Sequence, residues 1–202
     1  MIPMHVHDPI ALVTDYLLAV AALGFAVPLW RVHRMWGQAF VFTGVAAFLG
    51  GTYHAFAPEN ALLWKAVVYS VGLASFFLLA GTGGRALRIL ATAKLIVYLI
   101  WMATHDEFVW VIADYGLTLL IVAAVHLIWR SSATPWVLSS IAVSIAGALV
   151  QQFRVTVHPF WFDFNDLYHV IQIVALRLLY RAGKLRDERT EPKAVGSHLR
   201  SS

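Results

Sequence analysis

The sequence has no cysteine and little charge. Because none of the 202 residues is a cysteine, disulfides, thiolate metal sites, iron–sulfur clusters and cysteine nucleophiles are excluded. Charged residues make up 13% of the chain, about half the share found in soluble domains, and hydrophobic residues make up 60%. So few polar residues cannot cover a water-facing surface. A soluble enzyme, a disordered chain and a nucleic-acid-binding domain are therefore excluded, and the net charge of +4 indicates the basic ends of a membrane protein.

The N-terminus also lacks the features of a cleavable secretory signal. A signal peptide begins with a basic region, whereas this chain begins MIPMHVHDP and carries His5, His7 and Asp8 there. We therefore expect the first apolar segment to be a permanent membrane span.

Seven apolar segments follow one another, each about long enough to cross a bilayer as a helix. They cover residues 9–30, 36–57, 61–81, 86–104, 108–129, 135–153 and 163–181. Short polar links join them, so neighbouring helices must run antiparallel. The sequence predicts an all-α membrane protein, a seven-transmembrane helix bundle over residues 1–183. A basic, disordered cytoplasmic tail is expected over residues 184–202.

The basic residues predict the orientation, because cytoplasmic loops are rich in lysine and arginine. One side of the predicted bundle holds Arg31, Arg34, Arg85, Arg88, Arg130, Arg177, Arg181, Lys184, Arg186, Arg189, Lys193 and Arg200. The other side holds Arg154 with Asp8, Glu59, Asp106, Glu107 and Asp163. We therefore expect the N-terminus outside and the C-terminus inside, in an integral multi-pass protein of a bacterial inner membrane.

Polar residues gather at one depth, in the outer third of the predicted spans. An ionisable group inside a span is costly, so it indicates a functional site by default. The residues are Asp15, His54, Lys65, Asp114, Asn165, Asp166, His169 and Gln172, and Tyr69 shares a helix face with Lys65. The four in the last span follow positions i, i+1, i+4 and i+7, which is one stripe of a helix. Glycine and alanine lie below His54 on its own face and leave room for a neighbouring helix or a ligand.

This cluster could hold zinc, which histidine and carboxylate side chains bind. His54 and His169 would be nitrogen ligands, with Asp166, Asp114 or His158 as the third. Asp114 could act as a general base on zinc-bound water, and Lys65 could stabilise an oxyanion. The others would form a substrate-binding or structural polar cluster: Asp15, Tyr69, Asn165 and Gln172.

Purely structural roles are the alternative for each of these residues. His54 could lie at the interface, and Asp166 could cap the last helix or sit in its first turn. Lys65 could reach outward to water or pair with Glu59 or Asp114. Two geometric expectations follow: His54 and His169 converge, and Lys65 and Asp114 form an ion pair.

The histidines in GGTYHAF and NDLYHVIQ, together with the seven spans and the N-out orientation, resemble the alkaline ceramidases. That group belongs to the CREST superfamily, which also contains the progestin and adipoQ receptors. The resemblance implies a zinc-dependent hydrolase of lipid amides, with His54 and His169 at two of the family's five site positions. The other three differ: Asn165 replaces a histidine, Gly50 a serine and Lys65 an aspartate.

Three functions stay open from the sequence. The first is a metal-dependent hydrolase acting on a lipid amide or ester at the outer interface. The second is a non-catalytic membrane subunit or lipid-binding receptor on the same scaffold, with membrane-complex partner subunits. The third is a haem-b protein with His54 and His169 as axial ligands, and with His33 and His126 holding a second haem.

Overall fold

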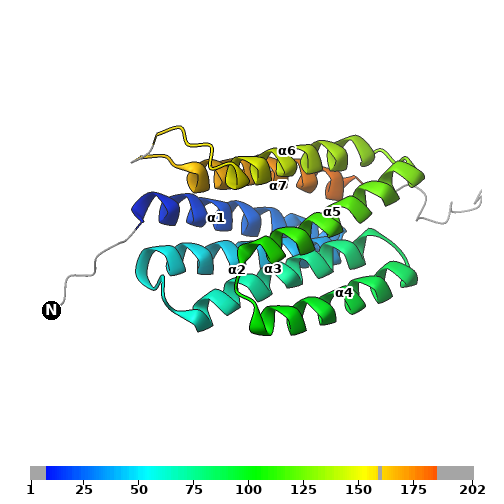
Figure 1. Ribbon diagram of the computed structural model, residues 1–202. Coiled ribbons are helices and arrows are strands. Elements are labelled where there is room, and N and C mark those ends of the chain that lie inside the picture. The colour runs from blue at the N-terminus through cyan, green and yellow to red at the C-terminus, as the bar shows by residue number, and fades with distance from the viewer. Residues whose placement is uncertain (1–7, 159–160, 186–202) are drawn as a thin grey trace, which may run out of the picture.

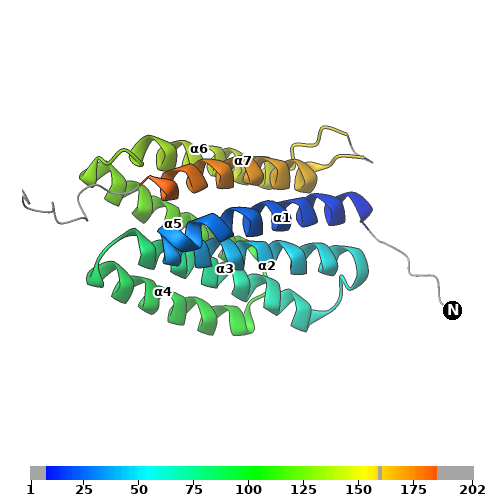
Figure 2. The same cartoon turned by 180° about the vertical axis from the view of Figure 1, so that it is seen from behind.

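The computed structural model describes residues 8–158 and 161–185 of the chain. Most of the predicted tail, together with His5 and His7, lies outside the described residues. The described residues form seven helices, as the sequence predicts (Figures 1 and 2). They are α1 (Pro9–Val32), α2 (Arg34–Phe56), α3 (Ala61–Thr82), α4 (Arg85–Thr104), α5 (Phe108–Trp129), α6 (Thr134–Gln152) and α7 (Phe164–Lys184).

Three helices begin at side-chain caps of the kind that satisfies free backbone N–H groups. The Asp8 carboxylate accepts from the N–H of Ala11 at the start of α1, and Asn60 caps α3 through the N–H of Leu63, both at 3.0 Å. Asp163 begins α7 with a capping box, in which Asp166 accepts in return from the Asp163 N–H. All three caps lie at the same end of the bundle, the left end in Figure 1.

Six helices enclose a common interior. Around the ring, α1 contacts α2, α2 contacts α3, α3 contacts α5, α5 contacts α6, and α6 contacts α7. The contact between α7 and α1 closes the ring. The remaining helix, α4, packs against the outside of α3. Figure 1 shows α4 along one edge of the bundle and the α6–α7 pair along the opposite edge. The interior of the ring is therefore the place for a site built from several helices.

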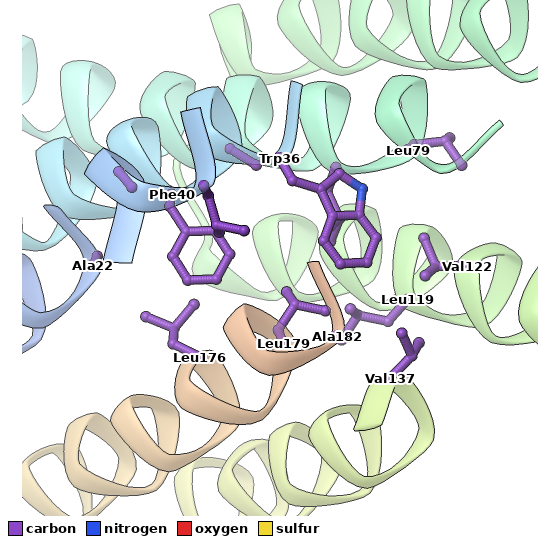
Figure 3. Close-up of a cluster of buried hydrophobic side chains, with 14 of the residues drawn as sticks. Ala22, Trp36, Phe40, Leu79, Leu119, Val122, Val137, Leu176, Leu179 and Ala182 are labelled. Atoms are coloured by element: carbon purple, nitrogen blue, oxygen red, sulfur yellow. The ribbon is translucent and has the colours of Figure 1, made fainter. Parts of the chain in front are cut away.

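The main apolar core lies in the half of the bundle where the chain passes from α1 to α2. Phe40, Leu29, Leu79 and Val122 are all fully buried there. Figure 3 shows Phe40 and Trp36 surrounded by side chains from the other helices, including Leu176 and Leu179 of α7. This packing fixes one half of the ring and leaves the other half to polar residues.

Among the described residues, six helices, α1 to α6, are long and apolar enough to cross a membrane. An integral multi-pass membrane protein is thereby indicated. The seventh helix has a similar length but carries Asp166, Arg177, Arg181 and Lys184, with further polar residues between them. The polar stripe of α7 begins in its N-terminal turns, where Asp166 and His169 are buried.

Candidate functional site

A cavity of about 380 Å³ occupies the interior of the ring. Ligand pockets in proteins fall in the range of about 300–1,000 Å³, so a small ligand or part of a larger one fits here. Lining residues extend over 12 positions in α2 (Thr43 to His54), and the same span holds in α5 and α7. At the rise of an α-helix this corresponds to a depth of about 16 Å.

The two ends of the cavity differ in chemistry. Its deep part is lined mainly by apolar side chains, including Leu18, Val71, Ala74, Leu119 and Leu176. Most polar lining residues lie toward the end where α7 begins, beside apolar residues such as Trp64 and Phe108, and they include Asp15, His54, Gln151, Asn165, His169 and Gln172. The cavity is therefore amphipathic along its length.

At the polar end, His169 joins α7 to α1. Its Nε2 lies 3.1 Å from Oδ1 of Asp15, and its Nδ1 lies 3.0 Å from Oγ1 of Thr14. The hydroxyl of Thr14 also lies 3.2 Å from Oδ1 of Asp166, the residue that completes the α7 capping box. These four side chains, the Asp15–His169 network, are all at least nine-tenths buried.

The network holds one proton between Asp15 and His169. A contact of 3.1 Å between a carboxylate oxygen and an imidazole nitrogen requires a hydrogen on one of the two atoms. The Thr14 hydroxyl can either donate to Nδ1 of His169 or accept from it. The direction of this hydrogen bond therefore determines whether Nδ1 of His169 carries a hydrogen. Carboxyl and imidazole paired in this way can give and take a proton from a third group.

Two residues that line the cavity each carry a buried acceptor atom with no hydrogen-bond partner among the described residues. The atoms are Oδ2 of Asp15 and Oε1 of Gln151. Buried polar atoms are nearly always satisfied, and leaving one unpaired costs about 1–3 kcal/mol.

Several predicted residues meet at this cavity. His54, His169, Asn165 and Gln172 all line it. The convergence of the His54 and His169 ring nitrogens stays a prediction. Asp15, predicted only as a member of the wider polar cluster, supplies the carboxylate that contacts His169. Asp166 lies behind His169, where its carboxylate oxygens accept from Thr14 and from the backbone of Asp163. The first-turn role considered for Asp166 is thus observed.

The predicted ion pair between Lys65 and Asp114 is wrong, although each residue has a charged partner. Lys65 lies 2.6 Å from Asp106 and also donates to the carbonyl of His105, at the end of α4. Asp114 pairs with Lys94 at the interface of α3, α4 and α5. The error has a physical cause: similar depth in the membrane does not make Lys65 and Asp114 neighbours, and the long side chain of Lys94 on α4 reaches the Asp114 carboxylate on α5.

Around Lys94 lies a second buried polar group. Its ammonium also donates to Oγ of Ser75 at 3.0 Å, and Ser75 shares a hydrogen bond of 2.7 Å with Thr118. The lysine and aspartate side chains are 11% and 7% exposed. This group links three helices and lies apart from the Asp15–His169 network. Tyr69 belongs to neither, since it packs against the apolar cluster of Val68, Tyr98, Met102 and Val111.

Sequence reasoning missed Thr14 and Lys94. Thr14 precedes Asp15 in the chain, but a threonine in a helix usually bonds to its own backbone, as Thr14 also does with Ile10. Its position within two turns of the Asp8 cap, beside an intramembrane aspartate, was the available signal. For Lys94 the signal was a cation near the middle of a predicted span, which calls for a buried partner.

The same geometry bears on whether the site can hold a metal ion. Among residues 8–158 and 161–185, no group of three or more His, Asp or Glu side chains is arranged to hold a metal ion. His54 and His169 share the cavity, but a third ligand does not join them in that part of the chain. The residues present therefore do not form a ready zinc site, and zinc binding stays a prediction.

Residues 10–188 match the model of a protein family described as a family of unknown function, DUF6962. The match covers most of the chain, so the protein belongs to this family. No curated protein and no solved structure matches the chain.

Proposed function

We propose that this protein binds a lipid-like amphiphile within the bundle, as a membrane receptor or as a subunit of a membrane complex. The observation that carries the proposal is the unpartnered Oδ2 of Asp15 at the polar end of an otherwise mainly apolar cavity. An acyl or isoprenoid chain suits the deep part of the cavity. A polar headgroup suits the end formed by Asp15, His169 and Gln151.

The unsatisfied atoms define the headgroup. Both Asp15 Oδ2 and Gln151 Oε1 are acceptors, so the ligand should present donors such as hydroxyl, amide N–H or ammonium groups. A phosphate or carboxylate would face the Asp15 carboxyl group and be repelled unless that group is protonated. We therefore expect neutral or cationic amphiphiles to bind more tightly than anionic ones of the same chain length.

A second candidate function is hydrolysis of a lipid amide or ester, favoured by the shared proton of Asp15 and His169. In that reaction the pair would take a proton from water as it attacks the carbonyl carbon, and would return it to the leaving amine or alcohol. The ceramidase resemblance supports this candidate. The proposed proton transfer uses only these side chains, because no three-residue ligand set for zinc is present among the described residues.

The membrane arrangement is also part of the proposal. We propose that α7 crosses the membrane beside the six more apolar helices, because it has their length and packs against α1 and α6. The positive-inside rule then places the N-terminus outside and the basic links inside. In a bacterial inner membrane, the polar end of the cavity would lie toward the periplasm.

Labelling of single cysteines tests this orientation, and the cysteine-free chain provides the background. Glu59→Cys lies in the α2–α3 link and Ser132→Cys in the α5–α6 link, and both positions are exposed. In spheroplasts, a membrane-impermeant maleimide should label Glu59→Cys and should label Ser132→Cys only after permeabilisation. The reverse pattern would contradict the orientation, and equal labelling of both before permeabilisation would contradict a membrane-spanning bundle.

Filling the cavity should remove ligand binding without unfolding the protein. The three atoms nearest to a Cβ at Gly50 belong to the carboxyl group of Asp15, at 3.7–3.9 Å, and Gly50 lines the cavity, so a larger side chain there enters it. Gly50→Leu should reduce the amphiphile that co-purifies with the protein by about tenfold or more, measured by lipid mass spectrometry of detergent-purified samples.

Gly24→Leu is the matched control for this experiment. Gly24 lies in α1, its Cβ position has no atom within 4 Å, and it is exposed on the surface of the helix. The control should retain the ligand and the same unfolding temperature. If Gly50→Leu retains as much amphiphile as Gly24→Leu, the cavity is not the binding site. An absorption spectrum of the same samples would reveal haem by its Soret band and so overturn the lipid proposal.

A further inference from the structure

The deep end of the cavity in the ring is closed by apolar side chains. Each of the six ring helices contributes one last lining residue at that end: Leu18, Thr43, Ala74, Leu119, Ser144 and Leu176. One helical turn further, each of the same helices carries a buried side chain of the main core. We call these six residues the floor of the cavity: Ala22, Phe40, Leu78, Val122, Ile141 and Leu179.

The floor is tightly packed. Phe40, Leu78 and Val122 are each at most 1% exposed. Figure 3 shows Phe40 projecting from α2 toward Leu176 and Leu179 of α7. Among the described residues, a second cavity at the opposite end of the bundle shares no lining residue with this one. Protein cores contain few voids and are hard to compress, so the floor resists a ligand that presses on it. The cavity therefore has a blind end.

The dimensions of the cavity suit one hydrocarbon chain. A volume of about 380 Å³ over a depth of about 16 Å makes the space long and narrow. It has room for one chain lying along the helices, but two chains side by side would need a wider space. The side chains at the last lining level are mainly apolar, and the hydroxyl of Thr43 donates to the carbonyl of Ala39 in its own helix.

The part of the cavity below the polar contacts is shorter than an ordinary lipid chain. Leu176 lies seven residues beyond His169 in α7, which is about 10 Å along the helix. The chains of bilayer lipids fill one leaflet, which is half of a hydrocarbon core about 30 Å thick. An amphiphile whose headgroup lies at Asp15 and His169 therefore reaches the floor before its chain is as long as those of the bilayer.

We propose that the floor limits chain length, so that the cavity accepts an amphiphile with one hydrocarbon chain shorter than the chains of the surrounding bilayer. This inference rests on the proposed function, because it concerns the ligand of the same cavity. A blind end also gives such a site its selectivity. Bilayer lipids surround the protein in large excess, and a closed floor excludes their longer chains from the cavity.

The floor should produce a break in the dependence of affinity on chain length. Each methylene group buried in the cavity should raise the affinity about fourfold. Once the chain reaches the floor, a further methylene must displace packed side chains or pull the headgroup away from Asp15, and neither change is favourable. The gain per methylene should therefore stop at one chain length, which we call the cut-off.

An equimolar mixture of monoacylglycerols that differ only in chain length tests this inference. Their headgroups are neutral and carry hydroxyl donors. The mixture is equilibrated with detergent-purified protein, and native mass spectrometry measures how much of each chain length is bound. Every chain also partitions into the detergent, but that partition is the same for all protein variants. The ratio of variant to wild type at each chain length therefore reports the cavity alone.

Two substitutions at the last lining level should move the cut-off in opposite directions. Ala74→Leu fills part of the deep end and should reduce binding of the longest accepted chains by about tenfold or more, with shorter chains unaffected. Leu176→Ala removes side-chain volume at the same level and should admit chains about two to three carbons longer. Thermal unfolding confirms that each variant is folded, and either variant alone is informative if the other does not fold.

Ala124→Leu and Leu79→Ala are the matched controls. Ala124 is exposed on α5, and Leu79 is fully buried in the core, but neither residue lines the cavity. Leu79→Ala should lower the stability, since it leaves a void in the core. Neither control should change the ratio to wild type at any chain length.

The outcomes separate this inference from the proposed function. If wild type binds monoacylglycerols but the cut-off stays in place in Ala74→Leu and Leu176→Ala, the floor does not limit chain length and only this inference is overturned. A co-purified lipid with two full-length chains that is lost in Gly50→Leu would overturn it as well. If wild type binds no member of the series and retains no amphiphile, the proposed function fails, and this inference fails with it.

Discussion

His169→Ala is expected to abolish retention of the amphiphile and to lower the free energy of unfolding by about 1–3 kcal/mol. The substitution removes the imidazole whose Nε2 contacts Oδ1 of Asp15. Both oxygens of that buried carboxyl group are then without a partner among the described residues. Lipid mass spectrometry of the purified protein measures the first effect. Thermal unfolding in the same detergent measures the second.

His105→Ala is the matched control, because His105 lies at the same end of the bundle but is only partly buried and is not among the residues that line the cavity. It should leave both quantities unchanged. His169→Gln separates binding from stability, since an amide can still donate to Asp15 and should restore part of the stability without the imidazole. If the hydrolytic candidate is correct, wild type should cleave a lipid amide or ester and both His169 variants should be inactive. Unaltered ligand retention in His169→Ala would contradict the proposed headgroup site.

Asp114→Ala is expected to be the most destabilising single substitution, by about 3–5 kcal/mol. It leaves the Lys94 ammonium buried among α3, α4 and α5 with only neutral oxygen partners such as Ser75. The double variant Lys94→Met/Asp114→Leu removes both charges and keeps similar volumes, so it should recover most of the lost stability. Denaturant or thermal unfolding of the three proteins in one detergent provides the comparison.

Asp106→Ala is the control for this second prediction. It deletes the same kind of carboxylate from the other lysine pair, but Asp106 is 62% exposed and Lys65 keeps the carbonyl of His105 as a partner. The expected loss is at most about 1 kcal/mol. A loss as large as that of Asp114→Ala would mean that burial does not determine the strength of these pairs. An Asp114→Ala protein as stable as wild type would contradict the buried ion pair.

The two buried polar groups have different expected roles. The Lys94–Asp114 group lies where α4 meets the outside of the ring, and each charge has its partner within the protein. The Asp15–His169 network lies inside the ring, and Asp15, which lines the cavity, has a buried carboxylate oxygen without a partner among the described residues. Substitutions in the first should therefore change stability without changing ligand selectivity, whereas those in the second should change both.

The sequence by itself determined the helices and the end of the bundle where the polar residues gather. Long apolar segments broken by short polar links leave few alternatives, because each segment must satisfy its own backbone in a bilayer. The predicted segments and observed helices agree within about three residues at each boundary, which is the ordinary uncertainty of helix ends. Helical periodicity also placed His169 with Asn165 and Gln172 on one stripe, and these three residues line the cavity together.

Only the tertiary structure decided which side chains meet. Depth along a helix fixes the height of a residue, but a partner also depends on helix rotation and on which helices are neighbours. Lys65 and Asp114 have similar depth, yet α4 lies outside α3 and presents Lys94 to Asp114, while Lys65 reaches Asp106. In the same way, the packing of α7 against α1 brings Asp15 and Thr14 into contact with His169. Such contacts join residues more than 150 positions apart, and no local pattern in the chain encodes them.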